Sequence, residues 1–146
     1  MNNSPIAAAN WSFPTRVWFG SGRATEIVAA LVEIGARNPL LVTDQGLASH
    51  PMITEMQATM TAAAIDHSTF TQIKPNPTGA NVEAGTACLR NGKHDSVIAV
   101  GGGSALDAAK AIAMMAGQDK PPWEFEDIGD NWRGAHAPPM PPALPL

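Results

Sequence analysis

The strongest structural signal in this chain is the stretch Ser96-Val97-Ile98-Ala99-Val100-Gly101-Gly102-Gly103-Ser104-Ala105-Leu106-Asp107-Ala108-Ala109-Lys110. Its first five residues are small or apolar in an unbroken run, which is typical of a strand buried on both faces. Three glycines follow, and glycine lets a backbone approach a ligand closely and adopt positive φ angles without strain. The residues from Ala105 to about Ala116 then predict a helix. A strand, a glycine loop and a helix are therefore expected in direct succession.

The glycine loop is a candidate phosphate-binding site. Ser104 is expected to be the N-cap of the helix, with Asp107 three residues later as a capping-box-like partner. The free N–H groups of the first turn would favour a phosphate or pyrophosphate, and Lys110 is close enough to pair with Asp107. The alternative is a tight turn that needs glycine only for packing. The stretch matches neither common phosphate fingerprint, so its spacing leaves a dinucleotide and other phosphate ligands open.

Upstream of this stretch, strand and helix patterns alternate along the chain. Predicted strands cover residues 16–19, 39–43, 67–73 and 96–100. Predicted helices, with apolar residues at helical spacing, cover residues 24–35, 51–65, 80–91 and about 105–116. This alternation predicts an α/β fold with a mostly parallel, Rossmann-like sheet and helices on both of its faces.

The composition excludes several classes of protein. The chain has 146 residues, of which 45% are hydrophobic and 15% charged, and its net charge is −4. A chain of this length can bury a core without disulfides, and its negative charge argues against a general binder of nucleic acid or of anionic membranes. The sequence has no apolar run long enough for a transmembrane helix and no basic region of a secretory signal. With one cysteine, Cys88, the simplest compartment is the cytoplasm.

The character of the chain changes along its length. Residues 1–12 predict a polar N-terminal arm, residues 13–118 the α/β domain, and residues 119–146 a connection that is first acidic and then proline-rich. Proline interrupts helices and central strands, so neither is expected after Pro138. The PxxP spacing of this tail also allows an adaptor role, in which an SH3-like groove binds the tail.

Two polar residues that follow predicted strands are further candidates. Asp44 stands at the carboxyl end of the strand over residues 39–43, where open α/β sheets bind ligands. Its carboxylate could accept hydrogen bonds from a ribose diol and would repel a 2′-phosphate, which favours NAD over NADP. The alternative is a structural turn with Gly46. Asn76 lies between two prolines in Pro75-Asn76-Pro77-Thr78, a loop that either presents its amide rigidly or forms an ordinary turn.

Four segments together resemble a known family. They are Phe19-Gly20-x-Gly22, Val42-Thr43-Asp44, Pro75-Asn76-Pro77-Thr78 and Gly101-Gly102-Gly103-Ser104-x-x-Asp107-x-x-Lys110. In this order and at these distances, they resemble the N-terminal, nucleotide-binding portion of the iron-containing alcohol dehydrogenase family. The resemblance covers roughly residues 13–118. Glycerol dehydrogenases and dehydroquinate synthases share the glycine loop, but the proline loop points to the iron-alcohol branch.

The resemblance implies a role for each matching residue. Asp44 would contact the adenine ribose, and Asn76 would lie near the bound cofactor, which is NAD or else NADP. The loop of Gly102, Gly103 and Ser104 would cradle the pyrophosphate. Asp107 and Lys110 would orient this loop or lie near the nicotinamide end.

The family also has parts that this sequence does not contain. Its members are much longer, and a separate helical domain holds iron or another divalent metal on one Asp and three His. The histidines of this chain are His50, His67, His94 and His136, and their spacing does not suggest a ligand set. His94 is read as part of a solvated turn with Asp95. No metal site is therefore expected in this chain.

The resulting hypothesis is an oxidoreductase that oxidises a small-molecule alcohol or reduces an aldehyde with NAD(P), assisted by a metal held elsewhere. This chain would supply part of the cofactor site and would be inactive alone. The alternatives are an inactive, truncated nucleotide-binding remnant or the adaptor with a proline-rich tail. Assembly into a homo-oligomer is compatible with the sequence. An incomplete sheet would expose an unpaired edge, so the isolated chain is expected to be marginally stable or to aggregate.

Overall fold

The computed structural model describes residues 9–12, 16–126, 128–134 and 140–146. The strands are β1 (Ala9–Ser12), β2 (Arg16–Phe19), β3 (Pro39–Asp44), β4 (Ser68–Ile73), β5 (Ser96–Ala99) and β6 (Ala143–Pro145). The α-helices are α1 (Ile27–Ile34), α2 (Pro51–Ala62), α3 (Gly79–Asn91) and α4 (Gly103–Met115). Short 3₁₀ helices are η1 (Arg23–Glu26), η2 (Pro122–Phe125) and η3 (Asn131–Gly134).

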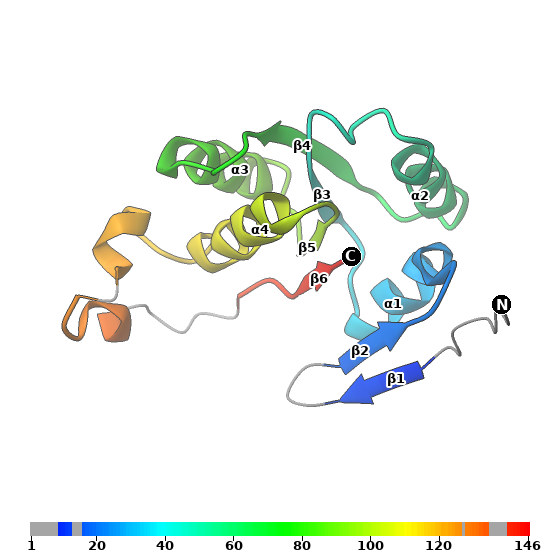
Figure 1. Cartoon of the computed structure of the whole chain (residues 1–146), viewed down its shortest axis with the longest axis horizontal. Helices are drawn as coiled ribbons and strands as arrows, with labels where there is room; N and C mark the ends of the chain where they lie inside the picture. The colour runs from blue at the N-terminus through cyan, green and yellow to red at the C-terminus, as the bar shows by residue number, and fades with distance from the viewer. Residues whose placement is uncertain (1–8, 13–15, 127, 135–139) are drawn as a thin grey trace, which may run out of the picture.

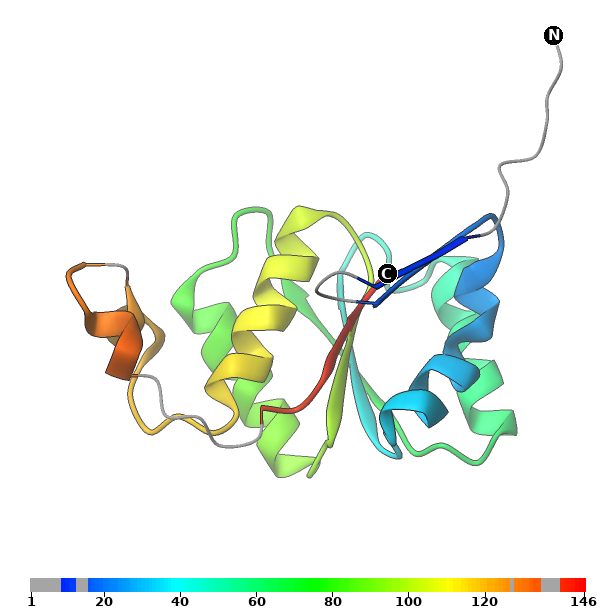
Figure 2. The same cartoon turned by 90° about the horizontal axis from the view of Figure 1, so that it is seen from below.

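The main sheet has four parallel strands in the order β4-β3-β5-β6. The chain passes from β3 through α2 to β4 on one side, and then through α3 to β5 on the other side of β3 (Figure 1). Helices α1 and α2 cover one face of the sheet, and α3 and α4 cover the other (Figure 2). The prediction of a mostly parallel α/β sheet with helices on both faces is therefore confirmed.

The two central strands are apolar because both of their faces are buried. Leu40 and Val42 of β3 belong to the core cluster under α3 and α4, while Leu41 between them belongs to the cluster under α1 and α2. Strand β5 alternates in the same way, with Val97 on the first side and Ile98 on the second. All five residues are completely buried, which explains why these strands read as unbroken apolar runs.

Close packing between α3 and α4 depends on one glycine. A Cβ added to Gly85 would overlap the side chain of Ile112 on α4 and would lie 3.1 Å from the Phe70 ring on β4. Both of these side chains are buried. Gly85 therefore lets α3 approach the sheet and α4 more closely than any larger residue would.

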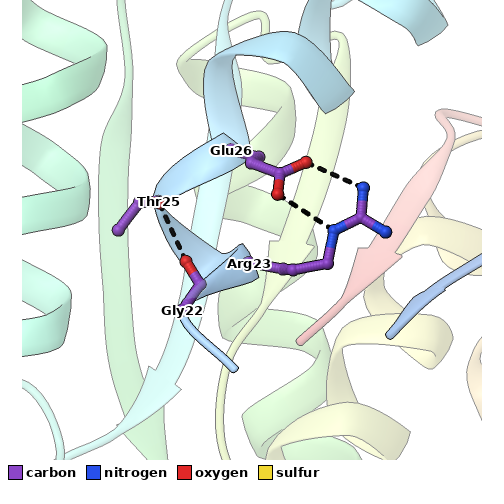
Figure 3. Close-up of polar contacts among 4 residues, drawn as sticks. All are labelled: Gly22, Arg23, Thr25 and Glu26. Carbon is purple, nitrogen blue, oxygen red and sulfur yellow. Dashed lines mark hydrogen bonds and ion pairs between the residues drawn. The ribbon is translucent and has the colours of Figure 1, made fainter. Parts of the chain in front are cut away.

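The predicted strand over residues 16–19 forms as β2, but it lies outside the main sheet. It pairs antiparallel with β1, in the segment that was expected to be a polar arm, while residues 1–8 lie outside the described residues. The turn after β2 is closed at Gly22, whose φ is 78°. Figure 3 shows its polar contacts: Thr25 Oγ1 donates to the carbonyl of Gly22 at 2.8 Å, and Arg23 pairs with Glu26 at 2.8 Å.

The proline-rich end of the chain contains an edge strand that the sequence did not predict. β6 lies beside β5 (Figure 1), and the Val97 N–H donates to the Pro142 carbonyl at 2.9 Å. The Leu146 N–H in turn donates to the Ala99 carbonyl at 2.7 Å. An edge position tolerates prolines because one side of the strand needs no donor. β5 is therefore paired on both sides, and β6 forms this edge of the sheet. Among the described residues, no helix is long and apolar enough to cross a membrane.

Candidate nucleotide-binding site

Three loops come together at the carboxyl edge of the sheet. They follow β3 at Asp44, β4 at residues 74–78 and β5 at Gly101. Because β4 and β5 lie on opposite sides of β3, the connection order reverses between β3 and β5. In open α/β sheets such a switch point forms a crevice in which ligands bind.

The glycine loop has one conformationally demanding position and two open ones. Gly101 has a φ of 143°, and a Cβ there would lie 3.0 Å from the Ala105 Cβ and 3.4 Å from Asp44 Oδ2. A Cβ on Gly102 or Gly103 would meet no atom within 4 Å. Gly101 is thus needed by the fold itself, whereas the other two leave free space in front of α4.

The amino end of α4 offers hydrogen-bond donors to this free space. The helix begins at Gly103 with Gly102 as its N-cap, and Ala105 and Leu106 both donate to the Gly102 carbonyl. By helix geometry, the N–H groups of Gly103 and Ser104 have no acceptor within the helix. In the part of the chain that the structure describes, no other protein group accepts from them. They are available to an anionic group.

The expected capping role of Ser104 was wrong. Ser104 is the second residue of α4 and not its N-cap, because the chain already turns into the helix at Gly102. Asp107 therefore does not form a capping box with it. Instead, Asp107 Oδ1 pairs with Lys110 Nζ at 2.8 Å, as the spacing predicted. Both side chains are largely exposed, and both lie on α4 beyond the glycine loop.

Asp44 uses its two carboxylate oxygens differently. Oδ1 accepts the N–H of Leu47 at 3.0 Å, which closes the turn after β3. Oδ2 lies on the side of Gly101, at the switch point between the strands. The two interpretations of Asp44, a turn residue and a ligand-facing carboxylate, are therefore compatible.

Asn76 lies beside the glycine loop and is connected to it. Its φ is 53°, and its N–H points to Ser104 Oγ at 3.4 Å, a long hydrogen bond. Asn81 holds the base of this loop: its side chain accepts the Thr78 N–H at 3.0 Å and donates to the Gln72 carbonyl at 2.8 Å. The proline loop is thus anchored at its base and at its tip.

Five of the seven predicted site residues are brought together by the fold. Asp44, Asn76 and the loop of Gly102, Gly103 and Ser104 meet at the switch point. Sequence reasoning did not include Gly101 among the site residues. The signal was present, because the first glycine after a buried strand is the position where the chain must turn sharply.

The described residues do not fit a metal ion. Among residues 9–12, 16–126, 128–134 and 140–146, no three His, Cys, Asp or Glu side chains are grouped as metal ligands. His94 is buried rather than solvated, and its Nδ1 contacts the Asn38 side-chain oxygen at 2.9 Å, so its reading as part of a solvated turn was wrong. Asp95 lies beside it at the amino edge of the sheet, away from the glycine loop.

The family model described as iron-containing alcohol dehydrogenase matches residues 14–146, which is most of the chain. This chain belongs to the iron-containing alcohol dehydrogenase family. Among its family relatives is the NAD-dependent methanol dehydrogenase of Bacillus methanolicus, to which it is 32% identical over 107 residues. That alignment covers 73% of this chain and 28% of the relative.

Solved structures of the family agree with the fold. A 1,3-propanediol oxidoreductase matches with a TM-score of 0.77 and 28% identity, over 87% of this chain and 32% of that protein. Sulfoacetaldehyde reductase from Bifidobacterium kashiwanohense, determined with NAD⁺, matches with a TM-score of 0.67 and 30% identity, over 76% of this chain and 29% of that protein. The chain thus spans about a third or less of the length of these alcohol and aldehyde oxidoreductases.

Proposed function

We propose that this chain forms part of the NAD(P) site of an enzyme that oxidises a small alcohol or reduces an aldehyde. The observation that carries the proposal is the meeting of Asp44 with the open glycine loop at the switch point. Two features fit a dinucleotide there, the free space above Gly102 and Gly103 and the unpaired N–H groups at the start of α4. Family membership and the NAD⁺ complex of the reductase support the same assignment.

The proposed roles follow from what each group can donate or accept. The N–H groups of Gly103 and Ser104 would bind the pyrophosphate, aided by the positive end of the α4 dipole. Oδ2 of Asp44 would accept from the adenine ribose hydroxyls and repel a 2′-phosphate, which favours NAD over NADP. Asp107 and Lys110, paired and exposed, would act further along α4 toward the nicotinamide end.

Among the described residues, none is proposed to take part in the hydride transfer itself. When bound, the nicotinamide cofactor supplies the hydride donor or acceptor. The family name implies iron, but the described residues do not form a ligand set for it, so no step is assigned to a metal here. The chain's own contribution is to bind the dinucleotide and fix its position.

Calorimetric titration with NAD⁺ and NADP⁺ tests this proposal. Gly102→Val should lower the free energy of unfolding by no more than about 1 kcal/mol, the usual effect of an apolar residue at an N-cap, because an added Cβ meets no protein atom within 4 Å. It should weaken NAD⁺ binding at least tenfold, because it fills the proposed pyrophosphate space. Asp44→Asn keeps an acceptor for the Leu47 N–H and removes the negative charge. It should therefore reduce the ratio of the affinity for NAD⁺ to the affinity for NADP⁺. A folded chain that binds neither dinucleotide would refute the proposal.

A second candidate is nucleotide binding without hydride transfer by this chain. The lack of a metal ligand set among the described residues favours it. For this chain alone, both candidates predict NAD⁺ binding with no alcohol-dependent NADH formation, whether or not Fe²⁺ or Zn²⁺ is added. They differ in whether NADH forms once the other part of the proposed enzyme is supplied. The adaptor role has less support, because Pro142 and the residues after it are paired with β5. The PxxP segment that starts at Pro138 lies partly outside the described residues.

A further inference from the structure

The tip of the proline loop adopts a conformation that its sequence disfavours. Asn76 has a φ of 53°, in the left-handed region, although it is not a glycine and is followed by Pro77. A residue before proline normally adopts an extended conformation. Asparagine tolerates the left-handed region better than other side chains. Such conformations persist only where surrounding contacts hold them, and they gather at ligand clamps.

The contacts that hold this conformation link two loops of the proposed site. At its base, the loop is closed by the buried Asn81 side chain, which bonds to both Thr78 and Gln72. At its tip, the left-handed turn directs the Asn76 N–H to Ser104 Oγ at 3.4 Å. Ser104 is the second residue of α4, so its hydroxyl lies beside N–H groups that lack a protein acceptor.

The direction of this hydrogen bond has a chemical consequence. A serine hydroxyl has one O–H donor and two acceptor lone pairs. When the Asn76 N–H occupies one lone pair of Ser104 Oγ, the hydroxyl proton must point elsewhere. It is then available as a donor beside the free N–H groups of α4, where an oxyanion would need one.

We propose that Asn76 is a positioning residue for the nucleotide site, acting through its backbone and not through its side-chain amide. Its left-handed conformation orients the Ser104 hydroxyl as a donor to the cofactor pyrophosphate. This inference rests on the proposed function, since it names how the same site is pre-organised. A pre-organised donor raises affinity because less ordering remains to be done on binding.

Two substitutions at Asn76 distinguish the effect of its backbone conformation from the effect of its side-chain amide. Asn76→Gly and Asn76→Ala both remove the amide, but only glycine adopts positive φ without strain. We expect Asn76→Gly to bind ADP-ribose within about twofold of the original chain. Asn76→Ala should bind it roughly fivefold more weakly, because the loop tip leaves the left-handed conformation. Thermal unfolding of each variant serves as the control for folding.

Substitutions at Ser104 test the hydrogen bond between the Asn76 N–H and Ser104 Oγ. When Ser104→Ala is also present, Asn76→Gly and Asn76→Ala should bind ADP-ribose with the same affinity. When Ser104→Thr is present instead, the hydroxyl is kept, and the difference in affinity between the two Asn76 variants should return. The differences should be absent when adenosine, which has no pyrophosphate, replaces ADP-ribose. Equal losses for Asn76→Gly and Asn76→Ala, or no loss in either, would overturn the inference while leaving the proposed function intact. A folded original chain that fails to bind ADP-ribose would overturn both.

Discussion

Asp44 and Gly101 face each other across the two central strands, so that a Cβ on Gly101 would lie 3.4 Å from Asp44 Oδ2. They are distant in sequence, but Asp44 ends β3 and Gly101 follows the end of β5 by two residues, and these two strands are paired neighbours. The 3.4 Å distance would be an ordinary contact, and glycine is favoured at residue 101 by its φ of 143° and by the Ala105 Cβ, which would lie 3.0 Å from an added Cβ. The relationship places a carboxylate at the entrance of the glycine loop.

Gly101→Ala should destabilise the chain by about 1 to 3 kcal/mol. Its φ of 143° is strained for any L side chain, and the added methyl would approach both Ala105 and Asp44. Urea unfolding followed by circular dichroism measures the change. Gly103→Ala is the matched control, because its Cβ meets no atom within 4 Å and alanine favours a helix. Equal losses in both variants would contradict the steric argument.

Gly85→Val should lower the free energy of unfolding by about 1 to 3 kcal/mol, the usual cost of overfilling a packed core. The side chain would collide with Ile112, which is completely buried between α3 and α4. Ala84→Val, on the exposed side of the same helix, places the same side chain on α3 without the collision. Because glycine is a weaker helix former than valine, helix propensity does not account for a loss at residue 85. The prediction fails if the two variants unfold at the same urea concentration.

Asp95 should stabilise the fold in a pH-dependent way. Burial raises its pKa, but hydrogen bonds from the N–H groups of Arg37 and Asn38 and from the Ser96 hydroxyl outweigh burial, so the pKa is lowered. A lowered pKa in the folded state contributes stability that is present above the unfolded value, about 3.9, and is lost as the pH falls through the folded value. Asp95→Asn should therefore lower stability at pH 7. It should also flatten the fall in stability measured between about pH 5 and pH 2, and a parallel pH profile would argue against this role.

Leu144→Asp should release β6 from the sheet. Leu144 is half-buried against the cluster under α1 and α2, and a carboxylate there would lose hydration without a partner. Ala143→Asp, on the exposed neighbouring position, is the control with the same charge and strand propensity. We expect faster amide hydrogen exchange at the Val97 and Leu146 N–H groups only in Leu144→Asp, with a shift toward aggregates as the edge of β5 opens. Unchanged exchange in that variant would show that β6 pairs without this contact.

The sequence predicted the local elements of the sheet well, and its misses have two physical causes, one local and one tertiary. β3, β5 and α4 carry apolar patterns and glycine signals within a few residues of one another, so short-range chemistry identifies them. The N-cap of α4 was misplaced because serine is usually a better N-cap than glycine. In the structure the helix begins at Gly103, and Gly102 is its N-cap. His94 looked solvated because nothing near it in sequence reveals that Asn38 contacts it.

The alternation of strands and helices and the glycine loop follow from the sequence alone, because each depends on residues close together in the chain. The family resemblance also follows from it, because the order and spacing of four motifs are visible in the sequence. The neighbours of each strand, and therefore the meeting of Asp44, Asn76 and the glycine loop at one edge, follow only from the fold. The fold also determines that the proline-rich end pairs with β5 and that the first strands form a separate hairpin. Strand order depends on pairing between distant segments, which compete for the same backbone donors and acceptors, and no local pattern specifies the winner.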